Sequence, residues 1–566
     1  MRNHFNICLM ALLLAGVAAA APSASMVQNN FSFILPGVPN YGIAQGSLFA
    51  LKGTGMGPTE FPTLPDLSQG PLQTNLKGVT VSVTVNGTTT LVPLYYVWEN
   101  QIAGVIPSST PVGTGTMTVS FNGQTSSTPI TIVPAAFGML TVTGDGKGAA
   151  KAHDASNGNT LLSATTAANP GDVLVLWGSG LGPSPGDDSK YPFPQTDLKA
   201  NVKVFIGGQQ ANIAYAGRSQ FPGLDQINVT VPAGVTGCNV GVVVQTGNYV
   251  SNTATIPVAA SGRTCSDPAI TGLSAADMQT LLGKANIRIG FIGVDKTTTQ
   301  TPGFSFGGVT TPSTTSTSDS AFSEFVQYTP TQFSSGSGSF TQTSFGSCTV
   351  YQYRGQAGQI PETQPPTILD AGAITMKLPN GNTMNLTKQS GFYFASGSDA
   401  QGSKTPLFIP AAGGPFSFTN TGGTDVGVFS GAQITMPPAL NWTNMNAIDT
   451  IVRSQGVTVN WDTANPYTGF VTISGYSFSL GDGTDATNAL VSGFSCTAPY
   501  SAGTFKVEPY VLLSLVPGSA SIGGITIPTG SLSLSLNAPP VKFTAPSIDY
   551  AAISAVSSTG KSVTYQ

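Results

Sequence analysis

The stretch Gly46-Ser-Leu-Phe-Ala-Leu-Lys-Gly-Thr-Gly-Met-Gly-Pro58 occurs a second time in this chain, as Gly171-Asp-Val-Leu-Val-Leu-Trp-Gly-Ser-Gly-Leu-Gly-Pro183. A later landmark, Gln101-Ile102, returns as Gln226-Ile227, and both recurrences are 125 residues apart. A repeat that keeps its register over such a distance indicates two domains of one kind. In each copy a short apolar run ends at a glycine cluster, which is typical of a buried strand that runs into a turn.

Alternating apolar residues follow both copies of the repeat. In the first copy Val81, Val83 and Val85 precede Asn86-Gly87, and residues 202–208 of the second copy follow the same pattern. Alternation that ends in Asn-Gly or Gly-Gly indicates a β-hairpin. Short strands with regular turn residues over about a hundred residues predict an immunoglobulin-like β-sandwich in each copy.

Together these motifs resemble the IPT/TIG-type immunoglobulin-like repeats of uncharacterised secreted soil-bacterial proteins. The resemblance covers residues 27–260 and implies one sandwich at 27–134 and a second at 135–260. In such repeats the Gly-Pro turn and the Gln-Ile strand are fold signatures, so the resemblance implies no catalytic residues. The first copy departs from the family at Trp98-Glu99-Asn100, where these repeats carry a small Ser-Pro-Gly-like loop.

Residues 1–20 have the pattern of a secretory signal peptide. Arg2 precedes an apolar run over residues 7–17, and three alanines stand before Ala21-Pro22. The run is too short for a transmembrane helix, and no later segment has eighteen uninterrupted apolar residues. We therefore expect a secreted or extracytoplasmic protein, released or associated with the cell surface, without a transmembrane segment.

The composition favours an all-β fold and excludes some partners. Hydrophobic residues make up 40% of the chain and charged residues only 8%, with 68 glycines and 41 prolines. Apolar content at this level can form cores, and the abundant turn residues favour short strands. The net charge of −4 includes no polybasic patch, so we expect neither nucleic acid nor an anionic membrane as partner.

Four cysteines remain once Cys8 leaves with the signal peptide. No two of them have the close spacing of a zinc or redox site. We predict disulfides between Cys238 and Cys265 and between Cys348 and Cys496, although the two other pairings stay open on sequence alone. Disulfides of this kind are typical of an oxidising compartment.

One short helix is predicted in a linker over residues 261–289. Ser274 and Asp277 form a capping box, with Leu273 packing on Met278 and Gly283 ending the helix. The main interpretation is a connector that covers a sandwich edge. A docking element is the alternative.

Residues 290–566 are predicted to be a β-rich C-terminal region. Alternation indicates strands at 374–378 and 457–461, and an apolar run suggests one at 511–515. The Ser/Thr tract at 310–320 and the Gly/Ser run at 334–339 are predicted to be mobile loops. This region consists of one domain or of two sandwiches with a seam near 433–443, and parts of it resemble C-terminal regions of the same secreted families.

Catalytic chemistry has little support in the sequence. His153 is the only histidine outside the signal peptide, and the chain has no Gly-x-Ser-x-Gly motif. His153 is interpreted as a solvent-facing loop residue. A glycosidase needs two opposed carboxyl groups, and the best single candidate, Asp462, is interpreted as a turn residue that caps its own backbone. We therefore predict that the protein is not an enzyme, with no required cofactor.

Calcium is the one metal that the sequence suggests. Asp482 and Asp485 lie in a loop with oxygen side chains at short intervals, as calcium-binding loops have, but the loop lacks the twelfth-position glutamate of an EF-hand. An Asx-type turn is the alternative interpretation.

Aromatic side chains at the departure from the repeat are the candidate ligand contacts. Tyr95, Tyr96 and Trp98 lie on a strand that runs into the atypical loop, and alternation would place Tyr95 opposite Tyr96 and Trp98. Tyr96 is expected in the core, which leaves Tyr95 and Trp98 as candidates for stacking on sugar rings.

The sequence thus predicts a secreted, non-enzymatic adhesion, interaction or scaffold protein whose partner is an extracellular protein or a polysaccharide. The first alternative is a carbohydrate-binding protein that uses Trp98 and Tyr95. A hydrolase within residues 290–566 is the second.

Overall fold

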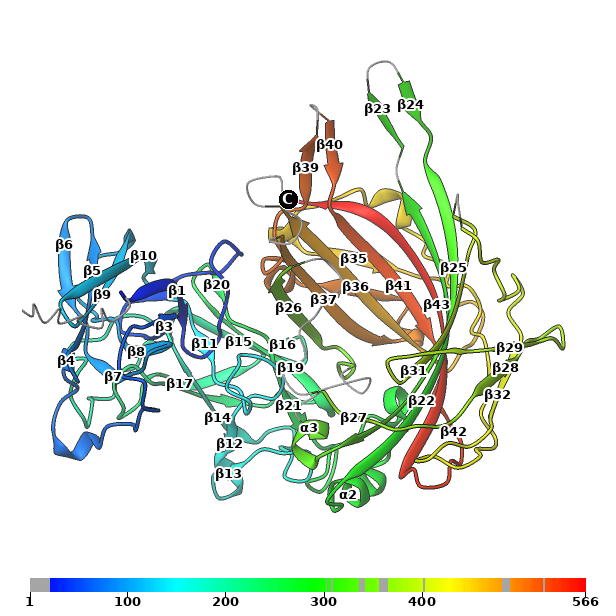
Figure 1. The fold of residues 1–566 in the computed structure, drawn as a ribbon, viewed down its shortest axis with the longest axis horizontal. Helices are drawn as coiled ribbons and strands as arrows, with labels where there is room; N and C mark the ends of the chain where they lie inside the picture. Colours follow the sequence, from blue (N-terminus) through cyan, green and yellow to red (C-terminus); the bar gives the residue numbers. More distant parts are fainter. Residues whose placement is uncertain are drawn as a thin grey trace, which may run out of the picture.

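The computed structural model describes residues 21–301, 303–306, 309–334, 342–355, 365–400, 403–480, 489–522 and 525–566. Strands account for 48% of the structure and helices for 7%, which confirms the predicted all-β class. Two sandwich-like units, shown in blue to green in Figure 1, lie beside a large curved sheet formed by the rest of the chain. Within the described residues, no helix has both the length and the apolar character of a membrane span.

The first unit has two facing sheets around a core of valine, isoleucine and leucine. One sheet has the order β1-β3-β8-β7, and the other β2-β10-β9-β5-β4 with β6 on β5. The strands are β1 (Ser23–Asn29), β2 (Ile43–Ala44), β3 (Leu48–Thr54), β4 (Asn75–Leu76), β5 (Val79–Val85), β6 (Thr88–Leu91), β7 (Leu94–Val97), β8 (Gln101–Val105), β9 (Gly113–Phe121) and β10 (Gln124–Val133).

The second unit repeats this layout. One sheet has the order β13-β12-β14-β18-β17 with β11 on β14, and the other β16-β15-β19-β20 with β21 on β19. The strands are β11 (Gly138–Met139), β12 (Ala152–Asp154), β13 (Thr160–Leu161), β14 (Val173–Ser179), β15 (Val202–Ile206), β16 (Gln209–Gln210), β17 (Asn212–Arg218), β18 (Asp225–Thr230), β19 (Gly237–Thr246), β20 (Tyr249–Val250) and β21 (Ala254–Val258).

The repeated sequence forms the same strand pair in both units. β3 pairs with β8 so that Leu51 lies opposite Ile102, and β14 pairs with β18 so that Leu176 lies opposite Ile227. The two landmarks of the repeat are thus the two halves of one ladder. The predicted hairpin at Asn86-Gly87 is also present, since both residues have positive φ and Val85 pairs with Thr88.

A curved 12-stranded sheet forms most of the C-terminal region. Its main path is β26-β37-β36-β41-β43-β22-β25-β31-β30, with β27, β34 and β42 paired at its sides. The strands are β22 (Ile287–Thr301), β25 (Thr314–Tyr328), β26 (Cys348–Arg354), β27 (Thr367–Ile368), β30 (Thr387–Gln389), β31 (Phe392–Ser398), β34 (Thr450–Ile451), β36 (Phe470–Ser479), β37 (Leu490–Pro499), β41 (Gly530–Asn537), β42 (Val541–Lys542) and β43 (Tyr550–Tyr565).

Smaller elements complete this region. A four-stranded sheet, β29-β28-β32-β33, lies on the convex side of the large sheet (Figure 1). The remaining elements are β23 (Phe304–Phe306), β24 (Val309–Thr311), β28 (Ile374–Lys377), β29 (Thr383–Asn385), β32 (Pro415–Asn420), β33 (Gln433–Thr435), β35 (Val457–Asn460), β38 (Thr504–Val507), β39 (Ser519–Ile522), β40 (Ile525–Pro528), α1 (Pro268–Thr271), α2 (Ala275–Leu282), α3 (Pro330–Ser334) and α4 (Pro509–Leu512).

The large sheet has one covered face and one largely bare face. On the convex face, residues such as Val294 and Ala555 pack under the four-stranded sheet, and residues such as Ile473 and Leu534 pack under α4 and the β35–β38 pair. Among the described residues, those that cover the concave face lie at its lower end, where α2 and α3 pack on apolar residues that include Ile289.

Two expectations about this region fail. Residues 310–320 are not a loop, because β25 pairs with β22 over its whole length, from Thr314 opposite Thr301. Residues 511–515 are not a strand, since Pro509 starts helix α4 and fixes the backbone for a helical first turn. On either side of residues 433–443, strands join the same 12-stranded sheet. Residues 335–339 of the Gly/Ser run lie outside the described residues.

The linker helix and both disulfides form as predicted. α2 has Ser274 at its N-cap in a capping box with Asp277, and Gly283 is its C-cap. One disulfide joins Cys238 in β19 to Cys265 ahead of α1, and the other joins Cys348 in β26 to Cys496 in β37. The linker therefore fastens the second sandwich to the large sheet.

Candidate functional site

The structure places Tyr95 between the two sandwiches. Its hydroxyl donates to the Pro222 carbonyl at 2.8 Å, and its ring packs on a cluster that includes Leu48 and Val105. Burial raises the pKa of Tyr95. Tyr96 is not part of the core cluster either, since a bulge between Leu94 and Tyr96 shifts the register of this strand.

Trp98 lies half-buried at the rim of the first sandwich. Its indole N–H donates to the Thr59 carbonyl at 3.2 Å, and its ring meets Phe61 edge to face, with 5.5 Å between ring centroids. Phe61 is 80% exposed, so Trp98 and Phe61 form a small aromatic surface. Phe61 carries no signal in the sequence, because it belongs to an irregular loop without any periodic pattern.

The other predicted positions show structural roles. His153 lies on strand β12, contrary to the loop expectation, and its Nδ1 accepts a hydrogen bond from the Trp177 indole at 3.1 Å. Burial and the nearby Lys151 lower the pKa of His153. Asp462 accepts from the Ala464 amide at 2.8 Å, as the turn interpretation requires.

The candidate calcium ligands Asp482 and Asp485 lie outside the described residues. Among the residues that are described, no three His, Cys, Asp or Glu side chains come together as a metal site would require.

A further candidate surface is the concave face of the 12-stranded sheet, here called the inner face. Neighbouring strands place hydroxyl side chains opposite one another along this face. Ser474 and Ser533 lie 2.9 Å apart, and Ser535 and Ser558 lie 2.7 Å apart, in each case between hydroxyl oxygens. Its hydroxyl residues include Ser318 (β25), Thr297 (β22), Ser558 (β43), Ser533 and Ser535 (β41) and Ser474 (β36).

Aromatic rings flank this hydroxyl ladder on both sides. On one side Tyr476 of β36 is 41% exposed, and Tyr351 of β26 lies over Gly493, where a side chain would clash with its ring. On the other side Phe392 and Phe394 of β31 are 37% and 43% exposed. The inner face therefore presents a band of hydroxyl groups between two sets of rings.

A cavity of about 310 Å³ lies at the lower end of the inner face, lined by Phe291, Phe322, Asn537 and the carboxyl group of Asp295. Burial raises the pKa of Asp295 to about 6. Asp295 is the only carboxyl group among the described residues that line this cavity.

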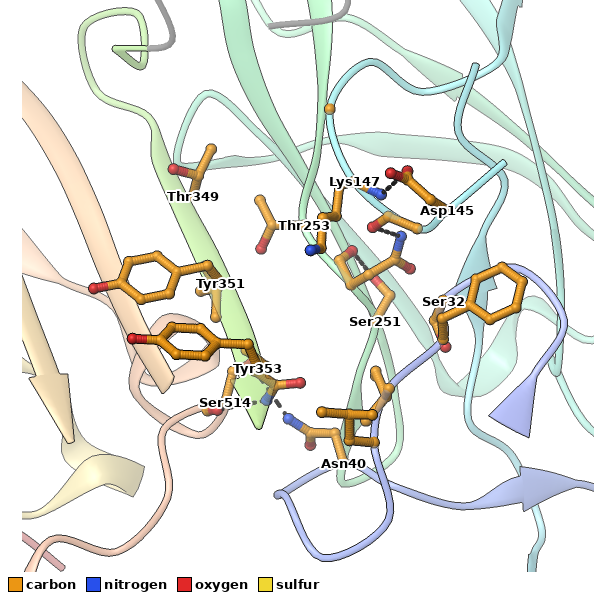
Figure 2. Close-up of a pocket in the computed structure, with 18 of the residues that line it drawn as sticks. Ser32, Asn40, Asp145, Lys147, Ser251, Thr253, Thr349, Tyr351, Tyr353 and Ser514 are labelled. Atoms are coloured by element: carbon orange, nitrogen blue, oxygen red, sulfur yellow. Dashed lines mark hydrogen bonds between the residues drawn. The ribbon is translucent and has the colours of Figure 1, made fainter. Parts of the chain in front are cut away.

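A second opening, a groove of about 570 Å³, lies where the large sheet meets both sandwiches. β26 forms one wall, and the other walls come from residues 32–35, 145–148 and 251–253. Figure 2 shows the rings of Tyr351 and Tyr353 on one side of β26, with Lys147 and Ser251 on the opposite side. Asp145 does not act as a free acid there, since it accepts from the Thr143 hydroxyl at 2.5 Å and the Lys147 amide at 3.0 Å.

Comparisons with known proteins identify no family. No family model and no curated protein matches the chain. Similar solved structures include the plexin A4 extracellular region (12% identity, 44% of this chain, 19% of that chain, TM-score 0.14). Another is a Bacteroides thetaiotaomicron protein of unknown function, with 12% identity over 40% of this chain and 47% of that chain and a TM-score of 0.14. A third is SGBP-B from a xyloglucan utilization locus of Bacteroides uniformis, with 10% identity over 67% of this chain and 86% of that chain and a TM-score of 0.14.

This chain thus spans 19% and 47% of the first two of these structures.

Proposed function

We propose that this protein is a non-enzymatic, extracytoplasmic binding and scaffold protein, and that the inner face of its large sheet binds a polysaccharide. The observation that carries the proposal is the hydroxyl ladder with exposed rings on both sides. The disulfides and the predicted signal peptide support an oxidising compartment outside the cytoplasm.

The chemistry of the inner face suits sugar rings. A serine or threonine hydroxyl both donates and accepts hydrogen bonds, as the hydroxyl groups of a sugar do. Aromatic faces contribute broad apolar contact to the C–H surface of a ring. Strands in a sheet lie about 4.8 Å apart, so the ladder repeats its hydroxyl groups along a line that an extended chain of sugars can follow.

Among the described residues, the carboxyl groups near the inner face favour binding without hydrolysis, because they do not form an opposed pair. Hydrolysis of a glycosidic bond uses two carboxyl groups about 5 to 9 Å apart. The cavity at the end of the inner face is lined by one carboxyl group, that of Asp295, among the residues described. Asp462 caps a turn.

The test compares aromatic variants on two parts of the molecule. Purified residues 21–566 would be assayed by affinity electrophoresis on a panel of soluble polysaccharides, beside Tyr476→Ala and Phe394→Ala. The matched control is Trp98→Ala, which removes a ring from the first sandwich. We expect retardation on at least one polysaccharide, weakened about ten-fold by either inner-face variant, since each ring contributes about 1 kcal/mol or more.

A loss confined to Trp98→Ala would instead place the site on the aromatic surface of the first sandwich. Absence of retardation on every polysaccharide would refute carbohydrate binding. It would leave an extracellular protein as the partner class.

A further inference from the structure

The groove beside β26 is bounded by a free edge of the large sheet. β26 is the last strand of its sheet and pairs with β37 in an unbroken register. The Gly355 amide donates to the Ala489 carbonyl at 3.0 Å, so odd-numbered residues direct their backbone groups toward β37. In an antiparallel ladder, opposed residues that exchange no backbone hydrogen bonds lie closer together than those that do. The Cα atoms of Cys348 and Cys496 are only 4.0 Å apart, so this even-numbered position is a pair without backbone hydrogen bonds.

The backbone groups of Val350 and Gln352 therefore face the groove. Both residues are half-buried and line it. Their backbone N–H and C=O groups make no hydrogen bond to any residue in the described part of the chain. A row of unpaired N–H and C=O groups at alternate residues is the template on which another strand adds.

Hydrogen bonds from three parts of the molecule hold the groove open. Asn40 accepts from the Val250 amide at 3.1 Å and donates to the Leu513 carbonyl at 3.3 Å. Gln352 donates from its side chain to the Ser514 carbonyl at 2.7 Å. A groove built before its ligand arrives lowers the ordering cost of binding.

The charges along the groove favour an acidic ligand. Lys147 is exposed on the wall opposite β26, and its ammonium group forms no ion pair with a described residue. Arg354 lies at the end of β26, where it donates to the Pro36 carbonyl at 3.2 Å. Asp145 is the only carboxylate among the described residues of the lining, and it already accepts two hydrogen bonds from its own turn.

We propose that β26 takes an extended peptide of another protein as an added strand, about five residues long, with an acidic side chain beside Lys147. This site is independent of the polysaccharide proposal, because it uses the edge of the sheet and not the inner face.

The experiment begins with a phage-displayed library of random heptapeptides, selected on immobilised residues 21–566. The best peptide is synthesised, and its affinity is measured by fluorescence polarisation for the native sequence and two matched variants. Val350→Pro removes the groove-facing N–H without removing a bond to β37, a position where an edge strand tolerates proline. Val350→Ala keeps that N–H. We expect about ten-fold weaker binding to Val350→Pro and nearly unchanged binding to Val350→Ala.

Two further measurements complete the test. Peptide binding should slow hydrogen exchange at the amides of Val350 and Gln352, and Lys147→Ala should weaken an acidic peptide several-fold. If Val350→Pro does not fold, the native protein is tested instead against copies of the selected peptide that are each N-methylated at one position. Only methylation at every second position should then reduce binding. The proposal is overturned if no selected peptide protects these two amides, if the two Val350 variants bind equally, or if the methylation series shows no alternation.

Discussion

The buried ion pair of Arg218 and Asp225 differs from the carboxyl group of Asp295 in how its charge is compensated. Arg218 and Asp225 are completely buried at the junction of the sandwiches, where they form an ion pair and Arg218 also donates to the Gly182 carbonyl. Asp225 accepts from the amides of Gly180 and Leu181 as well. Desolvation of this pair is thus offset by several charge-assisted hydrogen bonds, as a structural ion pair requires.

Among the described residues no ion pair compensates Asp295, and we predict that its charged form lowers stability at neutral pH. Burial raises its pKa to about 6, above the unfolded value of 3.8, so the folded protein holds this proton more tightly than the unfolded chain. The resulting stability is fully present below about pH 4 and is lost as the pH rises through about 6. Asp295→Asn should raise the free energy of unfolding by up to about 3 kcal/mol at pH 7.5 and leave it unchanged at pH 4.

Urea denaturation at both pH values measures this difference. Asp462→Asn is the control, because asparagine keeps the turn that Asp462 caps. An equal effect of Asp295→Asn at pH 4 and pH 7.5 would contradict the assignment.

Among the elements, strand β26 depends on a disulfide at its first ladder position. Cys348 and Cys496 lie directly opposite each other and are separated by 148 residues, against 27 residues for Cys238 and Cys265. If a disulfide stabilises by lowering the entropy of the unfolded chain, the Cys348–Cys496 bond contributes about 1.5 kcal/mol more than the Cys238–Cys265 bond, because it closes the longer loop. We predict that replacing both Cys348 and Cys496 by serine lowers the free energy of unfolding by more than the matching change at Cys238 and Cys265.

Denaturant titration of the two double variants gives the comparison, and hydrogen exchange should rise first in β26. A larger loss from the Cys238 and Cys265 pair would show that strain or local packing outweighs loop entropy.

The elements also show what a sequence can predict. The β3–β8 and β14–β18 pairs were predictable, because the repeat preserves both partners of each ladder. β25 was not, because its polar residues from Thr314 to Ser320 resemble a solvated loop until β22 and β31 pair on both sides of them.

The inner face could not be predicted from the sequence for a related reason. Its hydroxyl and aromatic residues alternate on strands that are distant in sequence, and only the sheet brings them together.

At the scale of the whole molecule, the two sandwiches and the curved sheet are joined by specific contacts. Ser108 donates from its amide to Asp188 at 2.6 Å between the sandwiches. Phe205 of β15 stacks on Tyr510 of α4, with ring centroids 4.3 Å apart, and residues of the second sandwich belong to the same apolar cluster as α4. Both proposed binding surfaces are therefore held at fixed positions relative to the sandwiches.

This coupling gives the last prediction. Tyr510 is buried, and burial raises its pKa, so Tyr510→Ala should lower the free energy of unfolding by about 3 kcal/mol. Because the ring connects α4 to β15, hydrogen exchange should accelerate in both elements. Tyr467→Ala is the matched control, since Tyr467 packs against Tyr500 within the C-terminal region. Exchange that accelerates in α4 alone would show that the second sandwich and the curved sheet open independently, and the groove at β26 would then lose its fixed opposite wall.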